Sequence, residues 1–476
     1  MTEGKYDHVK AAVEFCNLIR STLGPRGMNK MVLGNDTILT NDGSTIINAL
    51  KGGNPIIELL KNLAKSQELN IGDGTTTATI LTGQLLSNAM NLLDKGIHPT
   101  VIINGFNIAK VEAIKYLETL SKEENKERII KTAFGTKITS DISDHMTDLL
   151  LEVKDIENLK LFKKDNDNPT ESQLFKGYVF EGFTINDRMA PEITGKIAVL
   201  DFPVNMKFDR FNVTSADELE KASTFDTDYK KKIVDKLVEN DVKCIFYTDT
   251  TPEFETYLTD QGITGIVVFQ RTNVDGICNS LGASAISSIE QINDKHFGEG
   301  HIKYIKGIKG TIYIDGQMET LILKGNTSQF LDEMHRALED AVSLLRHDLK
   351  SVVGGGAVEI EIARAIREVS KKVGGKEQLA IDGFIEAIES LPSILAENCG
   401  LDSIEVLTLL KNLHNQGKTE MGVDPHAGVS DARERGIFEP VLIKVHAINS
   451  AVNISNLILK LDGIYQGDLD SEEAKK

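Results

Sequence analysis

Cysteine is scarce in this sequence, and its cysteines stand far apart. The four are Cys16, Cys244, Cys278 and Cys399. They form no Cys-x-x-Cys pair, and no histidine follows them at the spacing of a zinc ligand set. His296 and His301 are too isolated to be proposed as metal ligands. We therefore expect no zinc module, and we expect the four thiols to be core residues in a reducing compartment.

Positive charge is also in short supply. The chain has 53 lysines and arginines against 71 aspartates and glutamates, and its formal net charge is -18. Proteins that bind a phosphate backbone need clustered cations to release its counterions, so no nucleic acid is expected as a main partner. Single-stranded RNA on a local basic patch is the one form of nucleic-acid binding that this balance leaves open.

Long hydrophobic runs are the third feature that we judge to be missing. No apolar run is expected to be long enough to cross a bilayer. Residues 1–10 lack the apolar core of a secretory signal. Both observations predict a cytoplasmic protein without a membrane partner.

The pattern of the chain changes between its ends and its middle. With 476 residues, two to four domains are expected. Helical periodicity dominates both ends, whereas residues 197–269 alternate strand-like and helical segments as an α/β domain does, and three β-rich segments follow between 301 and 323. The charged run 121–128 is a candidate domain boundary. The middle third has no glycine-rich phosphate loop, so we do not expect the chemistry there.

The most informative stretch is Gly-Asp-Gly-Thr-Thr-Thr at residues 72–77, which opens the apolar helical run 78–93. The N–H groups in the first turn of a helix lack internal partners, and the helix dipole is positive there, so this stretch is suited to phosphate. Asp73 would hold the Mg²⁺ that accompanies nucleotide phosphates. The alternative is that Asp73 only caps the helix and the threonines fill its first turn.

Two more glycine-bounded loops come earlier in the chain. Residues 22–27, Thr-Leu-Gly-Pro-Arg-Gly, end a predicted helix and allow close approach of the backbone to a ligand. Residues 31–33 and 37–40 predict a hairpin, and Asp42 follows its second strand directly. Aspartates in turns usually bond their own backbone, so a purely structural role for Asp42 stays open on this evidence.

The C-terminal part contributes a carboxylate and a glycine run. Asp340 lies on a predicted long helix that begins at Ser328. Residues 354–356 are all glycine, which permits a hinge and close approach to a flat ring such as adenine, or is simply slack between helices. The alternative is that Asp340 is an exposed helix residue without a catalytic role.

Five motifs occur together and in order. They are Leu-Gly-Pro-Arg-Gly-Met at 23–28, Thr-Asn-Asp-Gly at 40–43, Gly-Asp-Gly-Thr-Thr-Thr at 72–77, Gly-Gly-Gly-Ala at 354–357 and Gly-Ile-Phe-Glu-Pro at 436–440. On these motifs the chain resembles a group II chaperonin over nearly its whole length. Within that family it resembles a subunit of the eukaryotic cytosolic ring chaperonin, CCT/TRiC. Ala-Lys-Ser-Gln at 64–67 and Gly-Val-Asp at 422–424 are most similar to the eta subunit.

The resemblance implies a multidomain α+β and α/β fold. A mostly helical equatorial ATPase domain would be built from both termini, at 1–123 and 354–476. A small intermediate domain would be crossed twice, at 124–194 and 319–353. An α/β apical, client-binding domain with a client-facing protrusion would be inserted at 195–318. This arrangement would explain why phosphate-binding motifs lie at both ends of the chain.

The resemblance also implies roles for single residues. Asp340 resembles the carboxylate that positions the attacking water, assisted by Asp42, and Asp73 resembles the Mg²⁺ ligand. Lys137 resembles the lysine that senses the γ-phosphate, and Glu439 would bond the ribose hydroxyls. The residues expected at ATP or ADP are Leu23, Gly24, Pro25, Asp42, Gly43, Gly74, Thr75, Thr76, Thr77, Thr136, Lys137, Gly355, Gly356, Asp424, Glu439 and Lys444. Because Asp340 would lie across the hinge formed by the glycines at 354–356, hydrolysis is expected to need domain closure.

Two residues depart from the family's pattern. Arg26 stands where many relatives have lysine, which keeps the charge. Gly135 stands where a small hydroxyl residue is common, and we expect it to weaken one phosphate contact.

The implied function is that of an ATP-dependent molecular chaperone. Hydrolysis of Mg-ATP would drive ring closure around unfolded or nascent clients such as actin and tubulin. The expected partners are other subunits of a hetero-oligomeric double ring and a prefoldin-like co-chaperone. Two alternatives stay open: a ring subunit that binds nucleotide and contributes mainly structure and client specificity, and an unrelated metabolic kinase or ATPase. Retention of Asp42, Asp73 and Asp340 favours the hydrolysing subunit over the first alternative.

Overall fold

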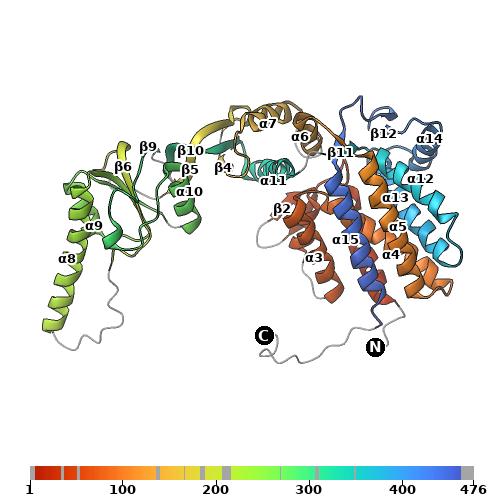
Figure 1. Ribbon diagram of the computed structural model, residues 1–476, viewed down its shortest axis with the longest axis horizontal. Coiled ribbons are helices and arrows are strands. Elements are labelled where there is room, and N and C mark those ends of the chain that lie inside the picture. Colours follow the sequence, from red (N-terminus) through yellow and green to blue (C-terminus); the bar gives the residue numbers. More distant parts are fainter. Residues whose placement is uncertain are drawn as a thin grey trace. The chain divides into compact units, whose positions relative to one another are not determined.

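The computed structural model divides the chain into two compact units (Figure 1). The structure describes residues 6–33, 37–50, 54–135, 140–165, 167–182, 188–205, 216–268, 270–305, 310–347 and 350–462. The first unit joins residues 1–151 to residues 332–476, and the second consists of residues 152–331. The second unit is therefore an insertion into the first.

The first unit is mainly helical. Its helices are α1 (Asp7–Asn17), α2 (Gly43–Ala49), α3 (Pro55–Ile71), α4 (Thr75–Asp94), α5 (Pro99–Leu120), α6 (Lys126–Phe134), α7 (Ser140–Glu152), α12 (Ala357–Ser370), α13 (Glu377–Asn398), α14 (Ser403–Asn415) and α15 (Val441–Leu459), with a short 3-10 turn at Arg20–Thr22. Helix α11 (Ser328–Leu345) begins in the second unit and continues into the first. Several starts follow from local sequence: Asn54 and His98 each cap a helix whose first residue is proline.

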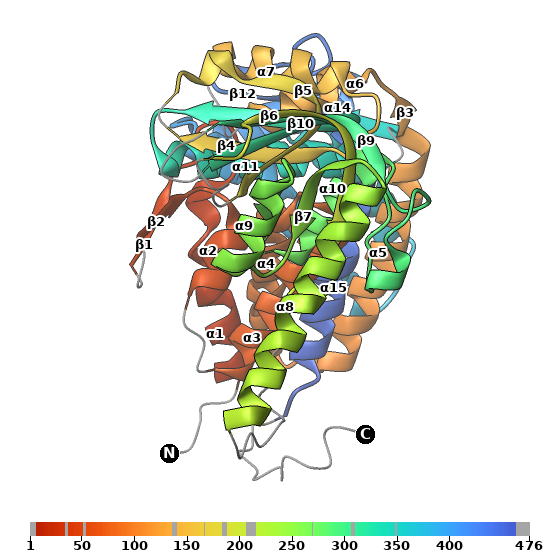
Figure 2. The same ribbon diagram turned by 90° about the vertical axis from the view of Figure 1, so that its left-hand side faces the viewer.

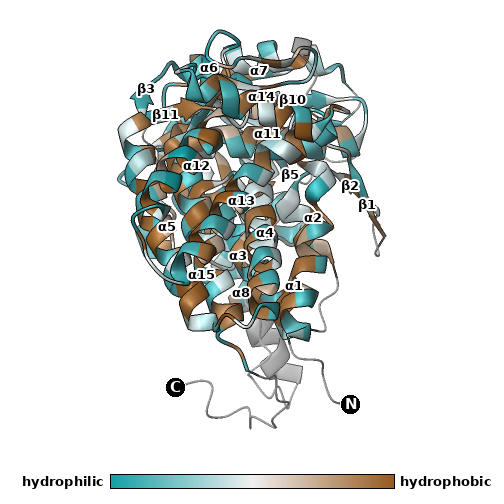
Figure 3. Cartoon of the chain, turned by 90° about the vertical axis from the view of Figure 1, so that its right-hand side faces the viewer, coloured by the Kyte–Doolittle hydropathy of each residue, from teal (hydrophilic) through white to brown (hydrophobic). Residues whose placement is uncertain are grey.

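The core of the first unit lies between long helices from both ends of the chain. Helix α4 packs against α13 and α15, and α5 packs against α12, α13 and α15. Their apolar faces form one large buried cluster. Phe106 of α5 and Phe384 of α13 meet there with ring centroids 6.3 Å apart. Figure 3 shows the apolar and polar stretches of these helices as brown and teal bands. Burial of these apolar faces is what holds the two ends of the chain together.

Small sheets complete the first unit. Strands β1 (Lys30–Leu33) and β2 (Thr37–Thr40) form the predicted antiparallel hairpin, whose turn lies outside the described residues. Strands β3 (Lys122–Glu123), β11 (Lys350–Val353) and β14 (Phe438–Pro440) form a three-stranded sheet, and β12 (Met421–Asp424) pairs with β13 (Gly428–Asp431). In the three-stranded sheet Val352 faces Glu439, which brings the glycine run next to the Glu439 motif.

The second unit is built on one seven-stranded sheet. Its strands are β4 (Lys160–Asp165), β5 (Gln173–Gly182), β6 (Glu192–Leu200), β7 (Val242–Tyr247), β8 (Thr264–Val267), β9 (Gly298–Ile305) and β10 (Gly310–Gly325), in the order β4-β10-β9-β6-β7-β8 with β5 paired to β10. Helices α8 (Ala216–Glu239), α9 (Pro252–Asp260) and α10 (Arg271–Leu281) contribute apolar residues to the same core (Figure 2). Strands β6, β7 and β8 are parallel, as the alternating pattern of residues 197–269 predicts.

The predicted mixture of helical and α/β parts is confirmed. The division into five segments stays a prediction, because the two compact units divide the chain at residues 151 and 331 rather than at the predicted domain limits. All four cysteines are buried and none forms a disulfide.

From the sequence alone, a helix is expected over residues 376–390 with a break at Pro392, and this break is wrong. Helix α13 continues through Pro392 to Asn398. A proline inside a helix removes a backbone hydrogen bond and usually bends or breaks the helix. Here the proline ring is buried beside Gly356, where a Cβ on the glycine would lie 2.6 Å from the Cβ of Pro392. Local propensity alone thus does not predict the end of this helix, whose proline is packed in the interior.

The expectation that no apolar run is long enough to cross a bilayer needs a correction. Among the described residues, α15 is long and apolar enough to cross a membrane by length and composition alone. In the structure it packs against α3, α4 and α5 inside the first unit, and its Lys444 is buried in ion pairs. Its hydrophobicity is accounted for by this core position.

Candidate functional site

One cavity of about 380 Å³ lies inside the first unit, and loops from both ends of the chain line it. Its volume is in the range of roughly 300–1,000 Å³ that is usual for small-molecule sites. The predicted residues that line it are Leu23, Gly24, Pro25, Asp42, Asp73, Gly74, Thr75, Thr76, Thr77, Asp340, Gly355, Gly356, Glu439 and Lys444. Residues more than 400 positions apart in sequence therefore converge on one site.

The start of α4 forms one wall of the cavity. Its N-cap residue is Gly74, with φ of 83°, so no side chain of that residue can satisfy the free N–H groups of the first turn. Asp73 lies one residue before the cap, and its Oδ1 accepts a hydrogen bond of 2.6 Å from the Gly74 N–H. The alternative in which Asp73 caps the helix is therefore not what the structure shows. The positive end of a 20-residue helix faces the cavity without a side-chain cap.

Asp42 combines a structural contact with a place on the cavity wall. Its Oδ2 accepts a hydrogen bond of 2.8 Å from the Thr45 N–H, so Asp42 is the N-cap of α2. The adjacent Gly43 does not line the cavity, but it packs tightly against α4. A Cβ on Gly43 would lie 2.4 Å from Oγ1 of Thr76. Glycine at 43 thus lets the Asp42 turn approach the threonines.

The loop Leu23–Gly24–Pro25 is held against the cavity from the opposite half of the chain. Asn398 donates its side-chain N–H to the Leu23 carbonyl at 2.8 Å. Gly24 has φ of 87°, and a Cβ there would lie 2.5 Å from Leu395. Arg26 does not line the cavity, and it donates a hydrogen bond to the Cys399 carbonyl at 3.3 Å.

Asp340 reaches the cavity from α11, which is fixed to the end of α3. Ser343, one turn after Asp340, donates a hydrogen bond of 3.0 Å to the Ile71 carbonyl. Leu344 packs in a small buried cluster with Ile71, Ile129 and Ile443. Asp340 and Asp73 line the same cavity in this structure, and the expectation that hydrolysis needs domain closure stays a prediction.

The other end of the cavity is formed by the glycine run and the Glu439 strand. Gly356, with φ of 84°, is the N-cap residue of α12. A Cβ on Gly354 would lie 2.6 Å from Oε1 of Glu439, so the glycine run packs closely against this carboxylate. This end thus offers a flat backbone surface beside a carboxylate, which suits a base and a ribose.

A buried ion-pair network lies behind Glu439. The ammonium of Lys444 lies 2.6 Å from Glu439 and 2.7 Å from Glu359. Burial alone would lower the pKa of Lys444, but the two carboxylates outweigh it and raise the pKa above its usual value. Oε2 of Glu359 is buried and has no hydrogen-bond partner among the described residues. This oxygen of a cavity-lining side chain fits a site that takes a hydrogen-bond donor from a ligand or a water.

Asp424 has a different place from the one expected. It does not line the cavity, although its neighbours Val423 and Pro425 do. Its carboxylate accepts hydrogen bonds from the N–H groups of His426 and Ala427 and from the Ser430 hydroxyl. Burial would raise the pKa of Asp424, but these hydrogen bonds and nearby Arg435 lower it to about 2. The described contacts of Asp424 therefore shape the β12–β13 turn, and its contact with nucleotide stays a prediction.

Sequence reasoning missed several residues of the site, and two predicted ones cannot be placed. Thr136 and Lys137 lie outside the described residues. The residues that were missed include Ser44, Glu68, Ile129, Lys131, Glu359, Arg435 and Ile443. Ser44 donates a hydrogen bond to Glu68, which adds a further carboxylate to the cavity lining. These residues lie one or two positions beside a motif or in an ordinary helix, so no local signal pointed to them.

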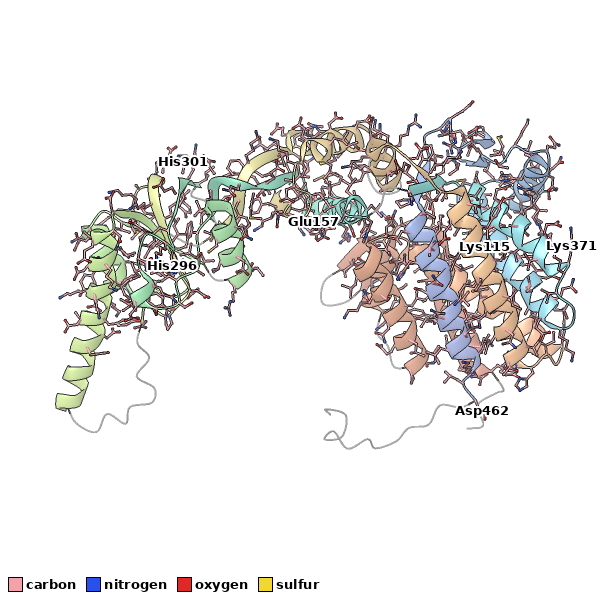
Figure 4. All side chains as sticks on the ribbon, viewed as in Figure 1. Lys115, Glu157, His296, His301, Lys371 and Asp462 are labelled. Carbon is pink, nitrogen blue, oxygen red and sulfur yellow. The ribbon has the colours of Figure 1, made fainter. Side chains whose placement is uncertain are left out.

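The carboxylates described at the site do not group as a metal centre would require. Within the described ranges, no group of three or more His, Cys, Asp or Glu residues is placed to hold a metal ion. His296 and His301 lie apart in the second unit (Figure 4), and His301 contacts Glu192 and Asp315. Mg²⁺ is usually held by one or two carboxylates together with substrate phosphates and water. Asp73 beside an uncapped helix start fits that form of binding.

Comparison with known proteins gives consistent similarities along almost the whole chain. The model of the TCP-1/cpn60 chaperonin family matches residues 15–467. Thermosome subunit alpha of Archaeoglobus fulgidus is 33% identical over 494 residues, which cover 96% of this chain and 91% of that protein. A thermosome subunit of Pyrococcus horikoshii is 32% identical over 96% of this chain and 90% of that protein. Thermosome subunit alpha of Thermoplasma acidophilum is 29% identical with the same coverage.

Proposed function

Since the chain belongs to the TCP-1/cpn60 chaperonin family, we propose that it is an ATP-dependent chaperone subunit that hydrolyses Mg-ATP in the cavity of its first unit. The observation that supports this most directly is the meeting of Asp42, Asp73 and Asp340 with the threonines of α4 in one cavity. Hydrolysis of a phosphoanhydride needs bound phosphates, a metal and a carboxylate that orients water. The site offers residues suited to each task.

The phosphates are proposed to bind at the start of α4 and along the Leu23–Pro25 loop. Free N–H groups and the helix dipole attract negative charge there. Asp73 would hold Mg²⁺ together with the phosphates. When bound, the metal would neutralise charge on the phosphate oxygens and ease cleavage of the terminal phosphoryl group. Lys137 and Thr136 are proposed to contact the γ-phosphate, although they lie outside the described residues.

Asp340 and Asp42 are proposed to act on the attacking water. Asp340 would accept a hydrogen bond from the water and so hold one of its lone pairs toward the phosphorus. Asp42 lines the same cavity and would assist this orientation. A strong nucleophile is not required, because positioning and charge stabilisation supply most of the rate enhancement in phosphoryl transfer.

The nucleoside is proposed to bind between Gly355–Gly356 and Glu439. Glu439 would accept hydrogen bonds from the ribose hydroxyls while Lys444 holds its carboxylate in place from behind. The β12–β13 turn shaped by Asp424 would complete the wall beside Val423.

The five-segment domain division and the client-binding role of residues 195–318 belong to the same proposal.

The assembly and its partners are proposed at two levels. At the coarser level, the subunit works with other chaperonin subunits in a ring and binds unfolded clients. At the finer level, it is a cytoplasmic CCT/TRiC subunit of eta type in a hetero-oligomeric double ring, with actin-like or tubulin-like clients and a prefoldin-like co-chaperone. The finer level is supported by the motifs at 64–67 and 422–424.

Native mass and phosphate release together test the proposal. The protein is purified as the assembly that it forms in its source cells, and phosphate release from ATP is measured with excess Mg²⁺ and with EDTA. We expect a multi-subunit ring whose ATP hydrolysis depends on Mg²⁺. A monomer that transfers phosphate to a small molecule, or a ring without hydrolysis at this subunit, would contradict the proposal. Subunit identification in the same sample decides between homo-oligomer and hetero-oligomer.

A further inference from the structure

We propose that Gln67 and His446 form a positioning pair that holds the Asp73 loop in the geometry needed for Mg-nucleotide binding, an inference that rests on the proposed function. Gln67 belongs to the Ala-Lys-Ser-Gln stretch at 64–67, which the site described so far does not use. The pair links α3, α15 and the loop before α4. Neither residue lines the cavity, so both would act through the backbone of Asp73.

The contacts of Gln67 are short and buried. Gln67 is 0% exposed. Its Nε2 donates a hydrogen bond of 2.8 Å to the carbonyl oxygen of Asp73, and its Oε1 lies 2.7 Å from Nδ1 of His446. Both polar ends of the amide are therefore engaged, which is the usual condition for burying such a group without a penalty.

The chemistry of these groups fixes the direction of each hydrogen bond. The Asp73 carbonyl can only accept, so the NH₂ end of the Gln67 amide must face it. The oxygen end of the amide then faces His446, so Nδ1 of His446 must carry the hydrogen. Ser450 is a much poorer partner for Nδ1, with its Oγ at 3.4 Å. Burial lowers the pKa of His446, which favours the neutral ring, and the contact with Gln67 places the hydrogen of that ring on Nδ1.

Helix α15 supports the same loop at a second point. A Cβ on Gly74 would lie 2.4 Å from Cγ2 of Ile443 and 3.1 Å from Nε2 of Gln67. The Asp73–Gly74 backbone is thus enclosed between Gln67 and Ile443. The next residue of α15, Lys444, holds Glu439 at the ribose end. One turn of α15 therefore fixes backbone and side chains at both ends of the cavity.

This arrangement matches the way that outer contacts support a metal ligand. Groups hydrogen-bonded behind a ligand orient it, and their removal typically costs about 10- to 100-fold in metal affinity or activity. A purely structural role for Gln67 would instead lower stability without selecting for the metal. The two roles are separated by comparing nucleotide binding with and without Mg²⁺.

Four variants test the pair. Gln67→Leu keeps the approximate volume and removes both hydrogen bonds. His446→Leu removes the donor, whereas His446→Asn returns an N–H donor near the position of Nδ1. His446 is only half buried, so its variants are expected to fold. The two His446 variants therefore test the positioning role if Gln67→Leu does not fold. Gln416→Leu, at an exposed position after α14, is the matched control.

The main measurement is the affinity for ADP by calorimetry in the assembled protein, with Mg²⁺ and with EDTA. We expect Gln67→Leu to weaken the Mg²⁺-dependent part of ADP binding by about 10- to 100-fold. His446→Leu should also weaken the Mg²⁺-dependent part of ADP binding, and His446→Asn should restore it. ADP binding in EDTA should stay near wild type in all variants. Without nucleotide, hydrogen exchange at the amides of residues 73–75 should be faster than in wild type only in Gln67→Leu and His446→Leu.

The outcomes are distinct. Unchanged Mg²⁺-dependent binding in Gln67→Leu, or an equal loss with and without Mg²⁺, would overturn the positioning role and leave the proposed function intact. His446→Asn behaving like His446→Leu would remove His446 from the pair. Wild-type protein that binds ADP without any effect of Mg²⁺ would overturn the proposed function and this role with it.

Discussion

The Ser343 hydroxyl donates a hydrogen bond of 3.0 Å to the carbonyl oxygen of Ile71, and this contact fixes the helix of Asp340 to the end of α3. The approach is close because Gly72 follows directly. A Cβ on Gly72 would lie 2.4 Å from the Ser343 side chain. The residue that is proposed to orient water is thereby held near the loop that is proposed to hold the metal.

Replacing Ser343 by alanine should therefore slow turnover more than it weakens binding. One neutral hydrogen bond contributes about 0.5–1.5 kcal/mol, so we expect ATP turnover to fall by roughly 2- to 10-fold with ATP affinity nearly unchanged. Phosphate release and equilibrium ATP binding measure the two effects. Ser121→Ala, which removes an exposed hydroxyl-to-carbonyl bond after α5, is the control. A loss of affinity as large as the loss of turnover would argue against the docking role.

Replacing Asp340 by asparagine should separate binding from hydrolysis. The variant keeps the size of the side chain and removes its ability to accept a proton or hold the water strongly. We expect turnover to fall by at least about 100-fold, as for loss of a general base, while ATP still binds. Occupancy and turnover are measured on the assembled protein. Glu339→Gln, on the same helix and paired with His335 at 3.2 Å, should turn over ATP normally. Undiminished turnover in Asp340→Asn would remove its catalytic assignment.

Much of the fold could be predicted because it depends on local signals. The starts of α3 and α5 follow from Asn54-Pro55 and His98-Pro99, which combine a capping side chain with a proline at the first helical position. The parallel strands of the second unit follow from short apolar runs between helices. The continuation of α13 through Pro392 could not be predicted, because local propensity disfavours proline inside a helix. The contact of Pro392 with Gly356 is tertiary, and tertiary context can override local propensity.

The site was predictable only in part, for a similar reason. The glycine and threonine motifs carry a local mechanism for phosphate binding, and the structure places them in one cavity. The supporting pairs carry no such signal. Glu359 lies in an otherwise ordinary helix and meets Lys444, which is 85 residues away in sequence. The separation between Gln67 and His446 is larger still, at 379 residues. Such pairs are recognised only after folding has brought the helices together.

Replacing Lys444 by methionine should destabilise the protein strongly. The variant would leave the carboxylates of Glu359 and Glu439 close together without their shared cation. Breaking a buried ion pair by removing one partner costs about 3–5 kcal/mol. Urea unfolding followed by circular dichroism measures this loss. Lys371→Met, which removes an exposed pair with Glu368, should cost at most about 1 kcal/mol.

The pH dependence of the Lys444 effect has a definite sign. Folding raises the pKa of Lys444, so its stabilising contribution is complete below the unfolded pKa of about 10.4 and is lost only as the pH rises through the higher folded value. The difference between wild type and Lys444→Met should thus be equal at pH 7 and pH 9. A difference that already shrinks between these two values would contradict the ion-pair assignment.

Asp424 should produce the opposite pH dependence. Folding lowers its pKa from 3.8 to about 2, so its contribution is complete above the unfolded value and is lost as the pH falls through the folded one. Replacing Asp424 by asparagine should destabilise the β12–β13 turn at neutral pH, and this difference from wild type should disappear between about pH 4 and pH 2. Hydrogen exchange at residues 424–431 across that range is the measurement.

Asp424→Asn should also weaken ATP binding, because Val423 and Pro425 on either side of Asp424 line the cavity. Asp402→Asn is a matched control, since Asp402 also accepts two backbone N–H bonds, at the start of α14. Asparagine caps a helix about as well as aspartate, so Asp402→Asn should change stability little and leave ATP affinity unchanged. Equal ATP affinity in the two variants would show that the turn held by Asp424 does not shape the nucleoside end of the site.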